Sequence, residues 1–332
     1  MIGRLLACCI AAVLAAGWCS AAQAQNYSIT SISAADFGNI VSANTGQTIF
    51  RADPATGSVS KLSGSGTRLS TTSVRSLVTV ACNNANPCDS ANAMVVITTT
   101  GTPTGRASAL QNFTVSTAGA TASIATAPGT GSSITFSLGP IGRSSSKTFW
   151  VGFDLPIEGN NTSGATGAAT SGFVVSVTRP NGNNGESLAA LAQASIFRAL
   201  AVSNSANLAF GKVTRPTSGT GTVSLAAATG TVSVTGTGVL ALSSTRSAAA
   251  FAITGEGGQA ISVSVPSSFN MTSSTGTIAV TTSPTVSGSQ VLSGALGAAG
   301  SLSLKVGGSF SLSTTTPAEA YSGSFVVTVQ YN

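Results

Sequence analysis

The sequence contains no histidine, and charged residues make up only 7% of its 332 positions. A serine or cysteine nucleophile is normally activated by a histidine base, so this absence excludes the usual catalytic triads. The acidic residues stand apart in the sequence, and no pattern pairs two of them as glycoside hydrolysis requires. The basic residues are scattered singly, without the runs and interleaved aromatic residues of a nucleic-acid surface. We therefore expect neither an enzyme nor a nucleic-acid-binding protein.

Motifs for metals and cofactors are also lacking. The alternating aspartates of a calcium loop do not occur. The glycine-rich stretch Gly255–Gly258 has no Lys-Ser/Thr of a phosphate-binding loop, and we interpret it as a β-turn. We expect no catalytic, cofactor or metal residues.

No apolar run reaches the 18 or so residues that would span a membrane. The apolar stretch 5–16 is shorter, follows the positive Arg4 and precedes the small-x-small tripeptide 22–24. These features predict a signal peptide over residues 1–24, with the exported chain beginning near Gln25. We expect no transmembrane segment.

Cysteine is scarce once the signal peptide is removed, because only Cys82 and Cys88 remain of five. In an oxidising compartment two such residues are expected to form a disulfide. A redox or metal pair is the alternative, but the spacing is not CxxC and no histidine completes a metal site. The intervening "NNANP" favours a turn, and we favour the structural disulfide.

Glycine, serine, threonine, alanine and valine dominate the composition, and 42% of the residues are hydrophobic. That apolar content is too high for a disordered chain. Threonine and valine favour strands, and glycine serves tight turns. Short segments with alternating apolar residues recur along the chain, as in "GTVSVTG", "AISVSVP" and "SLSLKVG". They predict an all-β sandwich protein.

Two Phe-Gly dipeptides, Phe37-Gly38 and Phe210-Gly211, lie 173 residues apart, and further matches share this offset. Chance matching in a glycine-rich chain is the alternative, but the matches keep their order, which favours two tandem copies of one module. We expect Phe37 and Phe210 to enter two cores. Gly38 and Gly211 would permit a bend or a close backbone contact.

The turn-rich stretch 179–187 is the expected boundary between the copies. This places a first, disulfide-containing domain at residues 25–185 and a second domain at 186–332. Residues 187–202 have the alanine and leucine content of a helix, whereas Ile196, Phe197 and Val202 favour a strand. Both readings stay open.

The second copy resembles DUF4402, a family of exported bacterial proteins. Its members open with "L-x-FG-x-[IV]" and continue through "GTV-x-[LV]" and "F-x-[IV]-x-G" to a closing "G-x-F-x-V-x-V-x-YN". The matching residues here are 208–213, 221–225, 251–255 and 323–332. The first copy departs from this pattern, because Asp36 precedes its Phe-Gly and its last strand lacks the Tyr-Asn ending.

The last residues of the chain alternate, which predicts a terminal strand with Phe325, Val327, Val329 and Tyr331 on one face. The family is similar to the pilin-type sandwiches of chaperone and usher systems, in which a strand from a neighbour completes an unfinished sheet. The resemblance implies two tandem immunoglobulin-like or pilin-like β-sandwich domains after a cleaved signal peptide. The four alternating residues would form the assembly strand.

By this resemblance, the protein is a fimbrial subunit or a two-domain adhesin, exported through the periplasm to the surface of a Gram-negative bacterium. Its partners would be a periplasmic chaperone and usher, together with other fimbrial subunits or copies of itself. Residues 25–33 are the candidate donor strand. The alternative is a free-standing extracellular structural or ligand-binding protein without strand exchange. The sequence does not identify a ligand.

Overall fold

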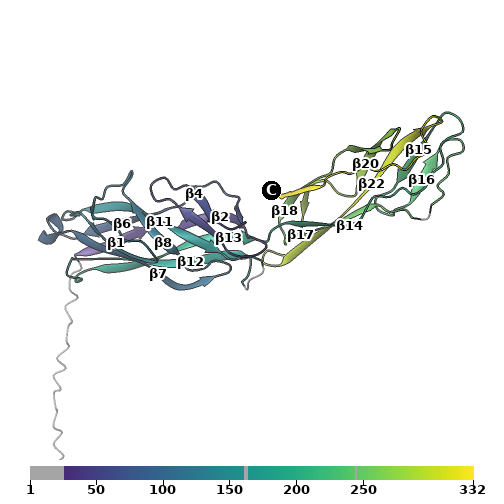
Figure 1. The fold of residues 1–332 in the computed structure, drawn as a ribbon. Coiled ribbons are helices and arrows are strands. Elements are labelled where there is room, and N and C mark those ends of the chain that lie inside the picture. Colours follow the sequence, from purple (N-terminus) through teal and green to yellow (C-terminus); the bar gives the residue numbers. More distant parts are fainter. Residues whose placement is uncertain (1–25, 161–163, 244) are drawn as a thin grey trace, which may run out of the picture.

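The computed structural model describes residues 26–160, 164–243 and 245–332, so the predicted signal peptide at 1–24 lies outside the described residues. The expected all-β fold is confirmed, since strands account for nearly all regular structure (Figure 1). One helical turn occurs in the described chain, the 3-10 helix η1 (Asn86–Asp89). Across these ranges we find no helix with the length and apolar character to cross a membrane.

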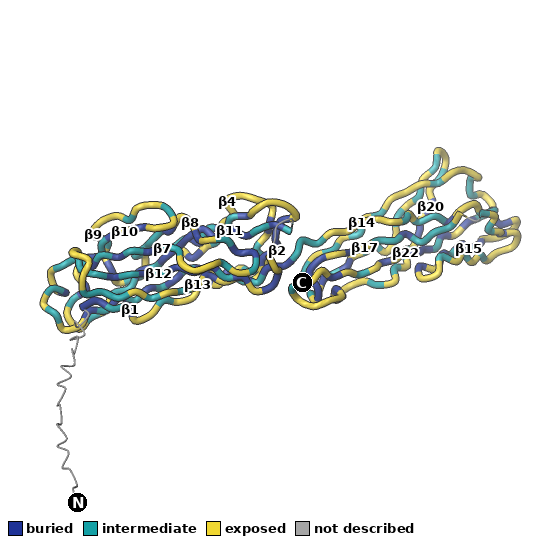
Figure 2. Tube along the Cα trace, turned by 90° about the horizontal axis from the view of Figure 1, so that it is seen from below, coloured by how far each residue is buried: buried dark blue, intermediate teal, exposed yellow. Residues whose placement is uncertain are grey.

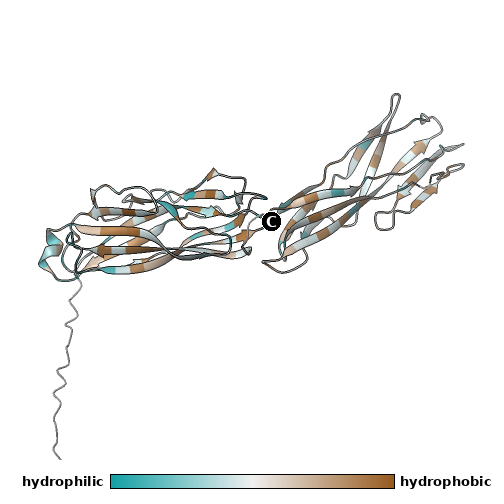
Figure 3. Cartoon of the chain, turned by 60° about the horizontal axis from the view of Figure 1, so that its bottom comes forward, coloured by the Kyte–Doolittle hydropathy of each residue, from teal (hydrophilic) through white to brown (hydrophobic). Residues whose placement is uncertain are grey.

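Two elongated units lie end to end (Figures 1 and 2). The buried apolar residues of the first unit form one cluster, from Tyr27 to Ile196. Those of the second unit form two clusters, which begin at Phe210 and Ala249. Apolar side chains alternate with polar ones along the strands of both units, as the brown and pale bands of Figure 3 show. Each unit therefore buries a core of its own.

The first unit is a sandwich of two sheets. One sheet has the order β1-β6-β11-β3-β4, with β8 on the other edge of β11. The other has the order β5-β2-β13-β12-β7-β10-β9. The strands are β1 (Tyr27–Ile32), β2 (Ala35–Val41), β3 (Thr48–Ala52), β4 (Val59–Ser63), β5 (Thr67–Arg68), β6 (Ser76–Cys82), β7 (Ala93–Thr104), β8 (Gln111–Ser116), β9 (Ile124–Thr126), β10 (Ser133–Leu138), β11 (Ser146–Ile157), β12 (Gly167–Thr178) and β13 (Glu186–Phe197).

The second unit also has two sheets. The larger has the order β14-β17-β22-β15-β16, with the hairpin β19-β20 joined to β22 through β20. The smaller has the order β21-β18-β23. The strands are β14 (Ala201–Ala206), β15 (Thr220–Leu225), β16 (Val232–Thr235), β17 (Ala249–Glu256), β18 (Ala260–Ser264), β19 (Ser268–Thr272), β20 (Thr277–Pro284), β21 (Gly288–Val291), β22 (Ala299–Ser313) and β23 (Thr328–Tyr331).

Within residues 187–202, for which helix and strand both remained open, the part up to Phe197 belongs to strand β13, and Ala201 and Val202 begin β14. β13 pairs antiparallel with β12 and parallel with β2, so it is the last strand of the first unit. The boundary expected after residue 185 therefore lies too early. The strand belongs to the first unit because its inward side chains, Ala192, Ala194 and Ile196, complete that unit's core. The change of unit follows Phe197.

The two Phe-Gly motifs occupy corresponding places. Phe37 is 0% exposed and its ring lies 6.1 Å from that of Phe153 in the first core. Phe210 is 7% exposed and lies 4.9 Å from the ring of Phe310 in the second. The following glycines have positive φ, +67° at Gly38 and +77° at Gly211. Only glycine adopts this conformation without strain, and the chain bends there.

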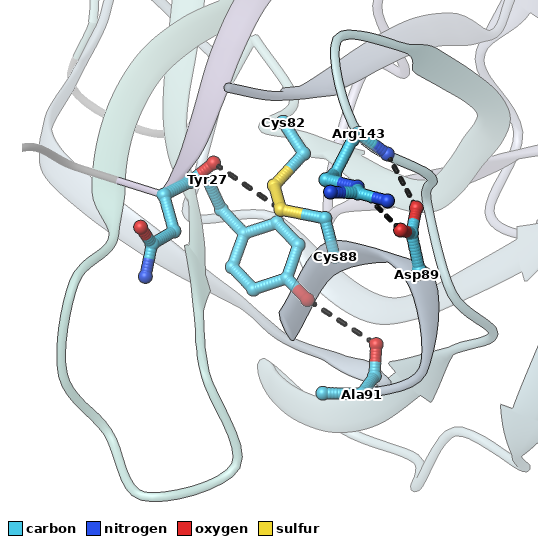
Figure 4. Close-up of a disulfide and its surroundings, with 7 residues drawn as sticks. Tyr27, Cys82, Cys88, Asp89, Ala91 and Arg143 are labelled. Carbon is cyan, nitrogen blue, oxygen red and sulfur yellow. Dashed lines mark hydrogen bonds and ion pairs between the residues drawn. A yellow bond between two sulfur atoms is a disulfide. The ribbon is translucent and has the colours of Figure 1, made fainter. Parts of the chain in front are cut away.

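The predicted disulfide is present. Cys82 at the end of β6 and Cys88 in η1 are bonded, with their Cα atoms 6.3 Å apart (Figure 4). Beside it, the Tyr27 hydroxyl donates a hydrogen bond of 3.2 Å to the carbonyl oxygen of Ala91. The disulfide thus attaches η1 to the sandwich. It lies at the end of the first unit that is farthest from the second (Figure 1).

Candidate functional site

The strand orders of the two units correspond. The series β1-β6-β11-β3-β4 of the first unit matches β14-β17-β22-β15-β16 of the second, and β12-β7-β10 matches β23-β18-β21. Individual hydrogen bonds repeat as well. Leu69 N donates to Asn39 O at 2.8 Å, and Leu242 N donates to Lys212 O at 2.8 Å. The first unit can therefore serve as a reference for the second.

The strand β13 of the first unit has no counterpart in the described part of the second. β13 lies between β2 and β12 and pairs with both. In the second unit, residues 208–213 take the place of β2 and β23 takes the place of β12, but the sheet ends at β23. Within the described ranges, the edge of β23 opposite β18 has no strand partner. Such an edge presents unpaired N–H and C=O groups to another strand.

A groove lies where the missing strand would run. It separates residues 204–210 from residues 321–325, and its lining includes four phenylalanines. The lining residues are Asn204, Asn207, Leu208, Phe210, Ala249, Phe251, Phe269, Met271, Tyr321, Ser322, Gly323, Ser324 and Phe325. The ring of Phe325 lies 5.1 Å from that of Phe269 and 6.2 Å from that of Phe251. The groove thus offers apolar contacts to the side chains of an added strand.

Burial differs at the two corresponding strands. On β12, the inward residues Phe173, Val175 and Val177 are each 0% exposed. The inward residues of the predicted assembly strand are only half-buried. These are Phe325, Val327, Val329 and Tyr331. The difference is expected, because β13 covers β12 on one side and nothing described covers that side of β23. Phe325 lines the groove, whereas Tyr331 contacts Phe197 at the junction of the units.

Asp36 of β2 is hydrogen-bonded to β13, the strand that has no counterpart in the described part of the second unit. Its Oδ2 accepts a hydrogen bond of 3.1 Å from Gln193 of β13, and its Oδ1 accepts one of 2.7 Å from Gly38 N. The second unit has Ala209 at this position. The residue that differs between the two units therefore adds a side-chain hydrogen bond to the backbone ladder between β2 and β13.

The N-terminal segment is not free to act as a donor strand, which corrects the expectation for residues 25–33. Its described part contains β1, which pairs with β6 from Tyr27 to Ile32. Tyr27 is 0% exposed, and Ile29 N donates a hydrogen bond of 3.2 Å to Glu186 of β13. The loose alternation of this sequence suits an edge strand whose side chains are already packed in its own unit.

The carboxylates have structural partners. Asp154 is 1% exposed and accepts hydrogen bonds from Arg51 at 2.7 Å and from Asn112 at 2.8 Å. Asp89 forms an ion pair of 2.5 Å with Arg143 beside the disulfide (Figure 4). Among the described residues we find no group of three or more His, Cys, Asp or Glu arranged to hold a metal ion.

The comparison with protein families agrees with this division of the chain. Residues 200–331 match the family model described as Domain of unknown function (DUF4402). Among solved structures, the chain is similar to the CsuC-CsuE chaperone-tip adhesion subunit pre-assembly complex of archaic chaperone-usher Csu pili from Acinetobacter baumannii. That match has 12% identity and a TM-score of 0.25, and covers 91% of this chain and 99% of the other. No curated protein matches the sequence.

The family match covers the second unit and not the first. That the first unit is another copy of the same module stays a prediction, although its strand order corresponds. The match begins directly after the linker that follows β13, at the point where the second core starts. Residues 200–331 of this chain thus match the DUF4402 family model.

Proposed function

We propose that this protein is an exported, non-enzymatic subunit of a bacterial surface fibre, whose second unit accepts a β-strand from a partner. The accepting site is the edge of β23 together with the groove lined by Phe251, Phe269 and Phe325. Backbone hydrogen bonds along the edge would supply affinity. Pockets for alternate side chains would supply specificity.

The absence of a β13 counterpart in the described second unit carries this proposal. The first unit shows what the completed sheet looks like, with a strand of 12 residues between its neighbours. In it, β13 runs antiparallel to β12. The incoming strand would accordingly run antiparallel to β23, with apolar side chains at alternate positions.

The donor strand would come from a different protein and not from a second copy of this one. β1 and β13 are both paired within the first unit, so the described residues offer no spare strand to a second copy. Subunits that accept a strand and donate none stand at one end of a fibre. We therefore favour the two-domain adhesin over a repeating shaft subunit, with a periplasmic chaperone strand occupying the groove before assembly in a Gram-negative bacterium.

The first unit would carry the adhesive loops. The end of this unit beside the disulfide contains η1, the loop 139–145 and the turn 179–185, since Gly142 N donates to Cys88 O and Tyr27 N donates to Asn184 O. Arg143 connects two of these segments, since its backbone N–H and its guanidinium bond to Asp89 and Asn86 of η1. Loops on a rigid scaffold are common binding surfaces.

The experiment supplies the missing strand in cis. A copy of residues 179–185 followed by a strand of alternating valine and threonine is appended after Asn332. A matched control carries the same valines and threonines as one block of valine followed by one block of threonine. This order removes the alternation. We expect only the alternating strand to raise the thermal midpoint of the second unit and to abolish binding of a free alternating peptide. If the alternating and blocked versions behave alike, the strand-accepting function is wrong and the free-standing module is favoured.

A further inference from the structure

The two units meet around one buried carboxylate. Glu256, at the end of β17, is 0% exposed. Its Oε1 accepts hydrogen bonds from Gly297 N at 2.5 Å and from the hydroxyl of Thr166 in the first unit at 3.0 Å. Its Oε2 accepts a bond of 3.1 Å from Arg198 N in the linker between β13 and β14. A single side chain of the second unit therefore holds both the linker and the first unit.

Tyr331, the last residue of β23, binds the same linker through the carbonyl oxygen of Arg198. The Tyr331 hydroxyl donates a hydrogen bond of 2.7 Å to Arg198 O and accepts one of 2.7 Å from Glu256 N. The tyrosine ring lies 5.8 Å from the ring of Phe197, the last residue of β13. Burial raises the pKa of the Tyr331 hydroxyl, so it keeps its proton and stays a donor at neutral pH.

Two arginines lie near the carboxylate at the junction. The Arg198 guanidinium lies 3.8 Å from the carboxylate of Glu256. Arg106 of the first unit is 2% exposed, and Glu256 acts electrostatically on it. Its Nη1 donates to Ser42 at 2.8 Å and also to Asn160. Removing one partner from such a buried group is costly, so these contacts, once formed, favour one orientation of the two units.

Tyr331 makes these contacts from a weakly held strand. β23 pairs with β18 over Thr328–Tyr331 alone, and residues 323–327 form no ladder in the described structure. The corresponding strand β12 pairs along nearly its whole length on both edges. A short strand with one ladder opens locally at low free-energy cost.

We propose that adding a strand to the open edge of β23 also fixes the orientation of the first unit relative to the second. This rests on the proposed function, because the edge must be occupied. New backbone hydrogen bonds would restrict residues 323–331, and Tyr331 would transmit that restriction to the linker through Arg198. Such coupling is reciprocal, so a chain with an intact junction binds the incoming strand more tightly than one without. Tyr331 is a positioning residue in this scheme.

The test measures the distance between the units. Spin labels are placed at Thr135 in β10 and Ala279 in β20, which are both exposed. The distance distribution is recorded with and without the alternating peptide. Tyr331→Phe removes the hydroxyl and keeps the ring. The matched control is Tyr27→Phe, whose lost hydroxyl donates to Ala91 O at 3.2 Å within the first unit, outside the groove.

We expect the peptide to narrow the distribution in the wild-type chain and in Tyr27→Phe, and to leave it broad in Tyr331→Phe. We also expect Tyr331→Phe to raise the Kd of the peptide about five-fold, the lower end of ordinary coupling. A wild-type distribution that stays broad with the strand bound contradicts the inference, as does narrowing that survives in Tyr331→Phe. Failure of the peptide to bind contradicts the proposed function instead. In that case the chain with the appended strand tests the inference, because a strand in the same chain does not have to bind to the edge of β23 from solution.

Discussion

Gln193 on β13 donates a hydrogen bond of 3.1 Å to Asp36 on the parallel neighbour β2. The same carboxylate accepts a bond from Gly38 N and so supports the bend of the Phe-Gly motif. The second unit has alanine at the equivalent position and, among its described residues, no strand equivalent to β13. The change from Asp36 to alanine at this position therefore accompanies the absence of a β13 equivalent among the described residues of the second unit.

Asp36→Ala should lower the free energy of unfolding of the first unit by about 1 kcal/mol, the net value of an ordinary hydrogen bond. Urea unfolding followed by Trp150 fluorescence reports on this unit, because Trp150 is the one tryptophan after the predicted signal peptide. Asp36→Asn can still accept the bond from Gly38 N and should lie close to wild type. Equal losses in the two variants would show that the negative charge, rather than the bond to Gly38, is what matters.

Tyr27→Ala tests the assignment of the N-terminal strand. Tyr27 is fully buried against the first core, so truncation should cost about 3 kcal/mol or more. A free donor strand would instead tolerate the change and lose assembly only. Thr30→Ala, on the exposed side of the same strand, should leave the Trp150 transition within about 0.5 kcal/mol of wild type.

Much of the fold could be predicted from local pattern. Alternation and turn residues predicted the all-β class, and the spacing of Phe37 from Phe210 indicated two cores. The two cysteines predicted the disulfide. These features depend on side-chain period and on a few glycine conformations, which a single sequence displays directly.

The site was only partly predictable. Alternation identified Phe325, Val327 and Val329 as a half-buried face, but it could not show that the neighbouring strand is missing. That requires the register of β13, whose alanine-rich sequence also fits a helix. The domain boundary was misplaced because the turn-rich stretch 179–187 connects two paired strands of the first unit, β12 and β13, and not the two units. The role of Glu256 was hidden because its partners, Thr166 and Arg198, are distant in sequence.

Replacing both cysteines with serine should destabilise the first unit by about 2 kcal/mol, the chain-entropy value for so short a loop. The second unit has a separate core, so its transition in far-ultraviolet circular dichroism should stay in place. Reduction of the wild-type disulfide should give the same shift. A change in both transitions would mean that the two units unfold as one.

Glu319 gives the second unit an acid-sensitive contact. Hydroxyl groups of the turn 273–275, that of Ser273 foremost, lower the pKa of Glu319 from 4.5 to about 2. Because the folded pKa lies below the unfolded one, the stabilisation is present above pH about 4.5 and is lost as the pH falls toward 2. Glu319→Gln should remove this part of the pH dependence of the second unit's thermal midpoint, whereas Glu158→Gln in the first unit should not. An NMR titration of the Glu319 carboxyl carbon with a midpoint near 4.5 would contradict the prediction.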